Sequence, residues 1–125
     1  MSLADAKRLN FPSSKRLAKQ KDFDNVFRKG KRFAGSCMVM WVASASHNIT
    51  RVGVIASKKI FRKAVERSRV RRVLREIFRL NLPEMKSGVD IVLFPRQQIL
   101  QKKYREIEAD FLNTAEIAGL LKKKL

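Results

Sequence analysis

The sequence is poor in the residues that build disulfides, metal sites and histidine-based catalytic sites. It contains one cysteine, Cys37, and one histidine, His47, in 125 residues. A single cysteine cannot form an internal disulfide, and a single histidine has no partner for a metal site or an activated nucleophile. Because Cys37 lies in an apolar stretch, we expect it to be a small core residue.

Long apolar runs are also missing. The longest, residues 37–43 and 52–56, are far shorter than the ~20 residues that a membrane-spanning helix requires. The first residues mix charged and polar side chains, so no secretory signal is visible and a cytoplasmic location is expected. With 45% hydrophobic residues, the chain can bury one modest core, which indicates a single domain.

Acidic residues are scarce relative to basic ones. Eleven acids against 29 bases give a net charge of +18, which is typical of a protein that binds a polyanion such as nucleic acid. Two-metal nuclease chemistry needs clustered carboxylates. Asp22 and Asp24 point in different directions on a helix, and Glu106 and Asp110 lie near lysines, as surface pairs do. We therefore expect no catalytic residues and no metal ligands.

The basic residues are concentrated in two segments. Residues 51–79 hold eleven bases and two acids (+9), and residues 1–32 hold ten bases and three acids (+7). Proline and serine punctuate the N-terminus, which favours a flexible basic arm over residues 1–14. A single domain over residues 15–118 and a basic tail over residues 119–125 complete the predicted organisation.

Hydrophobic periodicity predicts an alternation of helices and strands in the order α-β-β-α-β-α. This order indicates an α+β fold, a two-layer α/β sandwich with a mixed sheet of about four strands. The first two strands are close enough in sequence to pair as an antiparallel hairpin. The residues alone favour a right-handed crossover between the last two strands, because ~98% of such crossovers are right-handed. The helices are expected over residues 20–29, 64–80 and 101–118, and the strands over residues 33–43, 51–57 and 89–94.

The predicted helix over residues 64–80 has two unlike faces. At about 100° of rotation per residue, one face is apolar and the other consists almost entirely of arginine. A solvated charged face would alternate signs, whereas arginines three and four residues apart repel by roughly a few tenths of a kcal/mol per pair. A phosphate backbone would relieve that repulsion, since the guanidinium fork matches phosphate. The apolar face carries Val70, Val73, Leu74, Ile77 and Phe78, and the polar face carries Ser68, Arg69, Arg71, Arg72, Arg75 and Arg79.

This helix resembles the signature helix of the bacterial ribonuclease P protein family, whose core is written Arg-Asn-Arg. Ser68 stands where the family pattern has asparagine, and serine has one donor where the amide has two. The resemblance covers about residues 15–118, because several further motifs occur in order. They are Asp22-Phe23, Val26-Phe27, Val52-Gly53-Val54, Ser57-Lys58-Lys59 and Asp90-Ile91-Val92.

The resemblance implies a noncatalytic protein subunit of an endoribonuclease that removes the 5′ leader of precursor transfer RNA. Its implied partners are the catalytic ribonuclease P RNA and precursor tRNA, with no membrane and no obligate protein partner. The holoenzyme would require Mg²⁺ through its RNA, and the protein alone would bind no cofactor. Residues 15–118 become an RNA-binding domain, and the crossover is implied to be left-handed, against the usual preference.

The resemblance also assigns two sites. A cleft between the first helix and the sheet would receive the single-stranded leader, for which aromatic faces are well suited. Phe27 and Val39 are explained equally well as core residues, whereas Trp41 is the better candidate for the cleft. The cleft residues are Phe23, Phe27, Val39 and Trp41. The catalytic RNA would contact Lys58, Lys59, Arg67, Ser68, Arg69, Arg71, Arg72 and Arg75.

Two other functions stay open at this stage. A structural ribosomal protein is the main alternative, because the same fold and charge would suit ribosomal RNA. A DNA-binding regulator would place the arginine helix in a major groove. Against it, the helix offers only arginines and Ser68 to base edges, and no partner helix precedes it at turn spacing.

Overall fold

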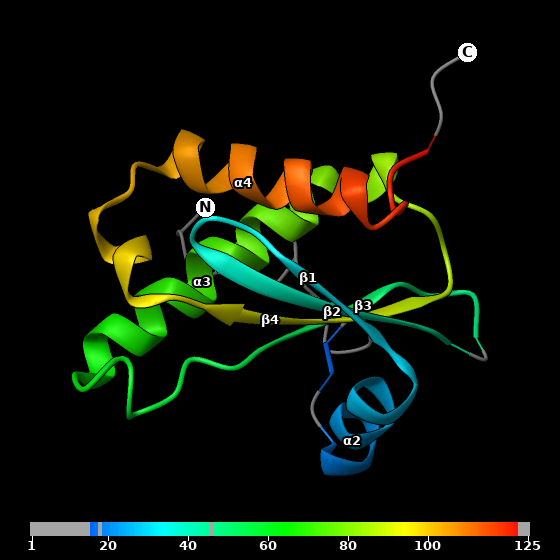
Figure 1. The fold of residues 1–125 in the computed structure, drawn as a ribbon, viewed down its shortest axis with the longest axis horizontal. Coiled ribbons are helices and arrows are strands. Elements are labelled where there is room, and N and C mark those ends of the chain that lie inside the picture. Colours follow the sequence, from blue (N-terminus) through cyan, green and yellow to red (C-terminus); the bar gives the residue numbers. More distant parts are fainter. Residues whose placement is uncertain (1–15, 18, 46, 123–125) are drawn as a thin grey trace, which may run out of the picture.

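The computed structural model describes residues 16–17, 19–45 and 47–122, so the predicted arm over residues 1–14 lies outside the described part. Within these residues, three α-helices and a four-stranded sheet make up the fold, which confirms the predicted α+β class (Figure 1). Two short 3-10 helices, η2 (Leu82–Glu84) and η3 (Gln97–Gln101), flank the last strand. The main elements are α2 (Gln20–Lys29), β1 (Lys31–Ala34), β2 (Met38–Ser44), β3 (Arg51–Val54), α3 (Ala64–Asn81), β4 (Val89–Pro95) and α4 (Tyr104–Ile117).

The single strand expected over residues 33–43 is two strands, and this part of the prediction is wrong. β1 and β2 form an antiparallel hairpin whose turn contains Ser36 and Cys37. The Asp110 carboxylate on α4 accepts the backbone N–H groups of Ser36 (2.8 Å) and Cys37 (3.0 Å). A Cβ on Gly35 would lie 2.8 Å from an Asp110 oxygen, so glycine permits the close approach of this carboxylate to the turn. Asp110 therefore shapes this turn, whereas the sequence analysis expected it to pair with a nearby lysine at the surface.

The hairpin expected between residues 33–43 and 51–57 is also wrong. The strand order is β1-β2-β4-β3, so β4 lies between the two strands that were expected to pair. It pairs antiparallel with β2 and parallel with β3. Since β4 is buried along most of its length, its run of Val, Ile and Leu belongs at the centre of the sheet.

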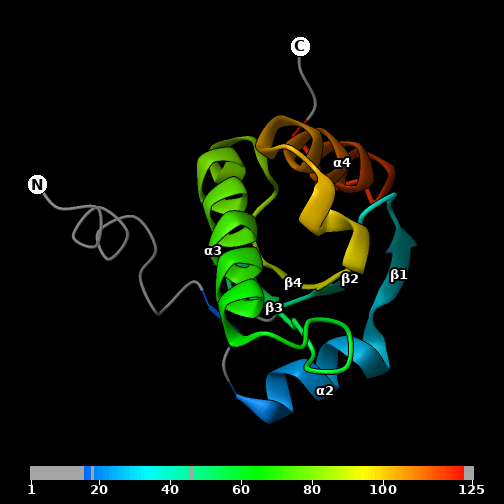
Figure 2. The same cartoon turned by 90° about the vertical axis from the view of Figure 1, so that its left-hand side faces the viewer.

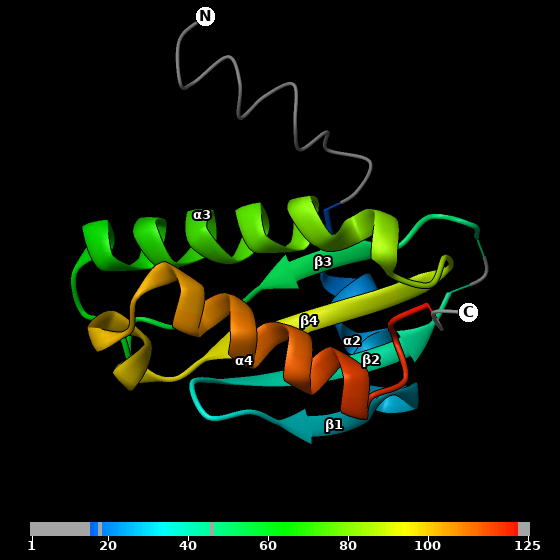
Figure 3. The same ribbon diagram turned by 90° about the horizontal axis from the view of Figure 1, so that it is seen from above.

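The crossover from β3 through α3 to β4 is left-handed, as the family resemblance implied. In Figure 3 the helices α3 and α4 lie in front of the sheet, and β3 and β4 both point to the left. If the view is rotated so that both strands point upward, with α3 still in front, β4 lies to the left of β3. A chain that passes through the front helix to a strand on the left makes a left-handed crossover. The common right-handed preference therefore fails for this chain.

The sheet carries helices on both faces, and each face has its own apolar cluster. The larger cluster lies under α3 and α4 (Figure 2) and is built around large side chains such as Phe61, Phe78 and Phe111. The smaller cluster lies under α2 and contains Val26 and Val92. Because successive strand residues point to opposite faces, the sheet supplies side chains to both clusters.

The last helix begins later than expected, at Tyr104, because residues 97–101 form η3. The Glu106 carboxylate accepts the backbone N–H of Lys103 at 2.8 Å, which fixes this start. The helix ends before Gly119, which has a φ of 75°. Within the predicted tail, Leu120 is buried and the N–H of Lys122 donates to the Glu84 carbonyl at 2.8 Å, so the packed domain extends to Lys122.

Candidate nucleic-acid interface

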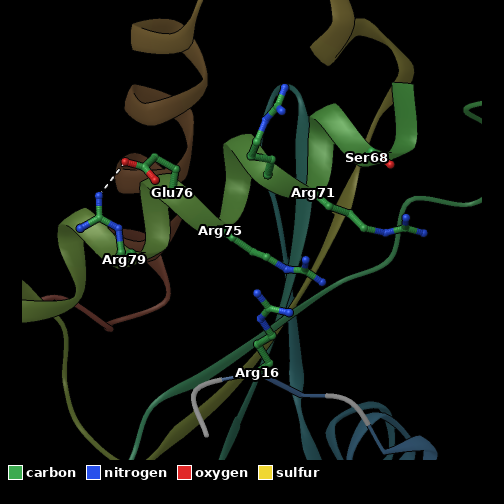
Figure 4. A pocket seen from close by; sticks show the side chains of 7 residues that line it. Arg16, Ser68, Arg71, Arg75, Glu76 and Arg79 are labelled. Carbon is green, nitrogen blue, oxygen red and sulfur yellow. Dashed lines mark hydrogen bonds and ion pairs between the residues drawn. The ribbon is translucent and has the colours of Figure 1, made fainter. Parts of the chain in front are cut away.

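The polar face of α3 borders a pocket of about 300 Å³ (Figure 4). Five of its seven lining residues are arginines, and one is an acid, so their formal charges sum to +4. We call this site the arginine pocket. Its lining residues are Arg16, Ser68, Arg71, Arg72, Arg75, Glu76 and Arg79.

The apolar face of α3 determines which side chains reach the pocket. Val70, Leu74 and Ile77 are buried against the sheet, which turns the residues between them outward. Arg16 comes from a different part of the chain. Its neighbour Leu17 is buried and donates its N–H to the Val52 carbonyl at 2.9 Å, so this segment runs along the edge of β3. Arg16 is thereby brought toward Arg75 (Figure 4).

Arg75 is a partly buried cation of the arginine pocket with two like-charged neighbours. Burial, together with the charges of Arg16 and Arg71, lowers the pKa of the Arg75 guanidinium from its ordinary value. Its Nε is buried and has no hydrogen-bond partner. A buried donor without a partner costs about 1–3 kcal/mol, and a phosphate oxygen would satisfy it while neutralising the surrounding charge.

The one acid of the pocket is already paired. Glu76 Oε1 accepts a hydrogen bond from Arg79 Nη2 at 2.6 Å, in an i,i+3 ion pair. Glu76 therefore offsets Arg79, whereas Arg71, Arg72 and Arg75 on the same helix have no second acid beside them in the described lining of the pocket. This arrangement favours an anionic ligand with several charges.

The structure brings together only part of the predicted RNA-binding set. Ser68, Arg71, Arg72 and Arg75 share the arginine pocket. Arg67 instead donates through Nη1 to the backbone carbonyls of Phe61 (2.8 Å) and Arg62 (3.0 Å), which ties the preceding loop to the helix. The remaining members are placed elsewhere: Arg69 lines a hollow between α3 and α4, Lys59 lines a hollow beside η3, and Lys58 is exposed in the loop after β3.

The predicted leader-binding residues all lie on the opposite face of the sheet, under α2. Phe27 makes an edge-to-face contact with Trp41, with ring centroids 5.6 Å apart. Phe23 covers Gly53, where an added Cβ would be 2.6 Å from the ring. These three aromatic side chains are partly buried. Val39 is 9% exposed and lies two residues before Trp41 in β2, on the same face of the strand. We call Phe23, Phe27, Trp41 and Phe94 the aromatic cluster.

Sequence reasoning missed residues at both sites. Phe94 packs against Phe27 at a centroid distance of 5.6 Å. It was read as core because the strand over residues 89–94 is apolar on both faces. Arg16 reaches the arginine pocket through pairing with β3, which its local sequence does not signal. Arg79 also lines the pocket but was not among the predicted RNA-binding residues, although its position on the arginine face of the helix could have indicated it.

The described residues offer little for metal or thiol chemistry. Among them, no three His, Cys, Asp or Glu side chains are grouped so that they could hold a metal ion. Burial and a hydrogen bond to Asp110 raise the pKa of the Cys37 thiol to about 12, so it stays protonated and unreactive. No helix in the described part of the chain is long and apolar enough to cross a membrane.

Fold and surface together define a small, strongly basic α+β protein with an arginine pocket on one face of its sheet and an aromatic cluster on the other. The family model described as Ribonuclease P matches residues 11–119. The ribonuclease P protein component of Clostridium botulinum (strain 657 / Type Ba4) is 38% identical over 106 residues, which cover 84% of this chain and 95% of that protein. The protein component of Alkaliphilus oremlandii (strain OhILAs) is 39% identical over 106 residues, covering 85% and 92%.

Solved structures agree with this match. The RNase P protein of Thermotoga maritima superimposes with a TM-score of 0.72 at 29% identity, covering 78% of this chain and 92% of that one. A Staphylococcus aureus RNase P protein gives a TM-score of 0.78 at 25% identity, covering 86% and 98%. The chain belongs to the ribonuclease P protein family. It is thus a protein component of an endoribonuclease, which replaces the ribosomal and DNA-binding alternatives.

Proposed function

We propose that the protein binds the catalytic ribonuclease P RNA through the arginine pocket and the 5′ leader of precursor tRNA through the aromatic cluster. In this way it promotes removal of the leader, while the RNA and its Mg²⁺ ions perform the cleavage. The observation that carries the proposal is the convergence of five arginines on one pocket in a family member whose described residues hold no carboxylate cluster.

The arginine pocket suits a folded phosphate backbone. Arg71, Arg72 and Arg75 occupy successive turns of α3, and Arg16 approaches from the edge of β3. Because the arginines come from two segments, they would contact the phosphates of a bound RNA from more than one side of the pocket. Each neutralised phosphate releases counterions and adds to the affinity at low salt. Ser68 adds a small hydroxyl donor and acceptor at the end of the pocket.

The aromatic cluster suits unpaired bases. Phe27 on α2 and Trp41 and Phe94 on the sheet are partly exposed rings, and every base has a face that can stack on them. Stacking of this kind tolerates any sequence, as a subunit that meets many different leaders would need. Since the cluster and the arginine pocket lie on opposite faces of the sheet, both RNAs can be bound at once (Figure 1).

The remaining parts of the proposal concern partners and surroundings. The protein would act in the cytoplasm, with the catalytic RNA and precursor tRNA as partners and without an obligate protein partner. Lys58, Lys59, Arg67 and Arg69 would add contacts outside the arginine pocket, because all four carry charge near the helix.

Reconstitution tests the proposal. Cleavage of a precursor tRNA by a bacterial ribonuclease P RNA is measured at limiting Mg²⁺, with and without the purified, RNA-free protein. We expect the protein alone to cleave nothing and to raise the cleavage rate of the RNA. Cleavage by the RNA-free protein, or no stimulation at any Mg²⁺ concentration, would contradict the proposal.

A further inference from the structure

A buried ion pair lies at the end of the sheet below α2. Arg51 on β3 and Asp90 on β4 are paired in the parallel register, so their side chains point to the same face. Arg51 Nε and Nη2 donate to the two Asp90 carboxylate oxygens, each at 2.9 Å. Asp90 is 3% exposed, and both of its oxygens are therefore satisfied by one fork.

The third nitrogen of Arg51 reaches the helix. Arg51 Nη1 lies 3.6 Å from Oδ2 of Asp22, and both side chains are 20% exposed. Asp22 is in the first turn of α2, so this contact joins the start of the helix to the sheet. The Asp90 fork fixes the Arg51 guanidinium, which makes it a rigid point of attachment for Asp22.

Among the described residues, the other side-chain contacts that hold α2 to the sheet are apolar. Val26 is fully buried against the sheet, and Phe23 lies over Gly53. Apolar contacts resist separation of the helix from the sheet, but they have little directionality. On their own, such contacts would permit small sliding or rotation of the helix. The contact between Asp22 and Arg51 is directional, so it can fix the position of the helix along the sheet, which the apolar contacts alone would not.

We infer that Arg51 and Asp22 are positioning residues that set the placement of α2 over the sheet, and with it the opening of the aromatic cluster. Phe27 lies five residues after Asp22, about 7.5 Å along the helix axis. It contacts Trp41 and Phe94 at 5.6 Å each, so a small movement of α2 changes the ring surface that bases can reach. This inference rests on the proposed role of the cluster in leader binding.

A matched pair of variants isolates this contact. Asp22→Asn removes the charge that faces Arg51 and leaves the buried pair with Asp90 in place, so the fold is preserved. Asp24→Asn makes the same charge change on the same helix, but Asp24 is exposed and bonded to Gln20 at 3.0 Å. Thermal melts establish that both variants are folded at the temperature of the assays.

The first measurement needs no RNA. Trp41 is the only tryptophan in the sequence, so fluorescence quenching by acrylamide reports directly on its accessibility. The second measurement compares holoenzyme affinity for precursor tRNA with affinity for mature tRNA. We expect Asp22→Asn to increase quenching and to reduce the precursor preference by about two- to fivefold, the range for one ion pair. Asp24→Asn should leave both values unchanged.

Three results would count against this scheme in different ways. If Asp22→Asn changes neither quenching nor precursor preference, the positioning role is wrong. If both variants reduce the preference equally, general charge is responsible and the role is again wrong. Trp41→Ala in the affinity assay provides the remaining distinction. If Asp22→Asn increases quenching while neither it nor Trp41→Ala alters the preference, the contact does position α2, and leader binding by the cluster is overturned instead.

Discussion

Replacing Arg75 by methionine should stabilise the free protein and weaken its binding to RNA. Arg75 is partly buried beside Arg16 and Arg71, and burial with these two charges lowers the pKa of its guanidinium. Two like-charge neighbours cost roughly a few tenths of a kcal/mol each. Relief of the unsatisfied Nε adds about 1–3 kcal/mol, so we expect the free energy of unfolding to rise by about 1–3 kcal/mol. Methionine retains the apolar stem that packs on the helix.

The same substitution should also remove the proposed contact between Arg75 and an RNA phosphate. A charged hydrogen bond is worth about 1.5–3 kcal/mol, so affinity for the catalytic RNA should fall by about 10–100-fold at low salt. The slope of log affinity against log salt should become shallower by about 0.9. Thermal melts of the free protein and filter binding at several salt concentrations measure the two effects.

Arg67→Met is the matched control on the same helix. Arg67 donates to the carbonyls of Phe61 and Arg62, so its loss should lower the melting temperature. The reasoning about Arg75 is refuted if Arg75→Met also lowers the melting temperature, or if its salt slope equals that of the unmodified protein. A lower melting temperature would mean that Arg75 has a stabilising partner within the protein, and an unchanged salt slope would mean that Arg75 contacts no phosphate.

Three further predictions concern other parts of the molecule. Trp41→Ala should weaken precursor tRNA binding by ~1–3 kcal/mol and leave mature tRNA binding nearly intact; a collapsed melt with parallel losses in both affinities would instead identify Trp41 as a core residue. Ser68→Asn should leave catalytic-RNA binding unchanged or tighten it, and a clear loss in filter binding would show that serine is required. Asp110→Asn should destabilise the protein at pH 7 by about 1–3 kcal/mol: burial opposes ionisation, but hydrogen bonds from Cys37 and Ser36 outweigh it and hold the pKa of Asp110 below its ordinary value. Since a depressed pKa stabilises the fold only while the carboxylate is charged, this deficit should shrink as the pH falls below about 4, and a deficit independent of pH in melts would contradict the assignment.

The sequence predicts local structure well where local pattern decides it. The helix around Val70 and Leu74 has a strong apolar period, and the structure places it as expected. Asp110, more than 70 residues away, holds the turn that divides the strand over residues 33–43, and the prediction overlooked the local turn signal of Gly35 and Ser36. The pairing of β3 with β4 is likewise non-local. Local turn spacing therefore suggested the wrong hairpin.

The candidate sites show the same limit. Arg71, Arg72 and Arg75 could be grouped from helical rotation alone, and the structure places them around one pocket. Arg67 lies one helical turn before Arg71, so the same reasoning grouped it with the others. Its side chain instead donates to backbone carbonyls, because the loop before α3 folds back on the helix. Phe94 joins the aromatic cluster only because β4 pairs with β2. The roles of these residues in binding stay predictions.

The central place of β4 has a consequence for the order in which the protein can fold during synthesis. Chains are made from the N-terminus, and β3 has no sheet partner among the named strands until residues 89–95 have been added. Until then, β2 and β3 expose unpaired edges, which are sites for association between chains. A chain truncated before Val89 should therefore remain unfolded. The high positive charge of the sequence would keep such incomplete chains apart through mutual repulsion until the sheet can close.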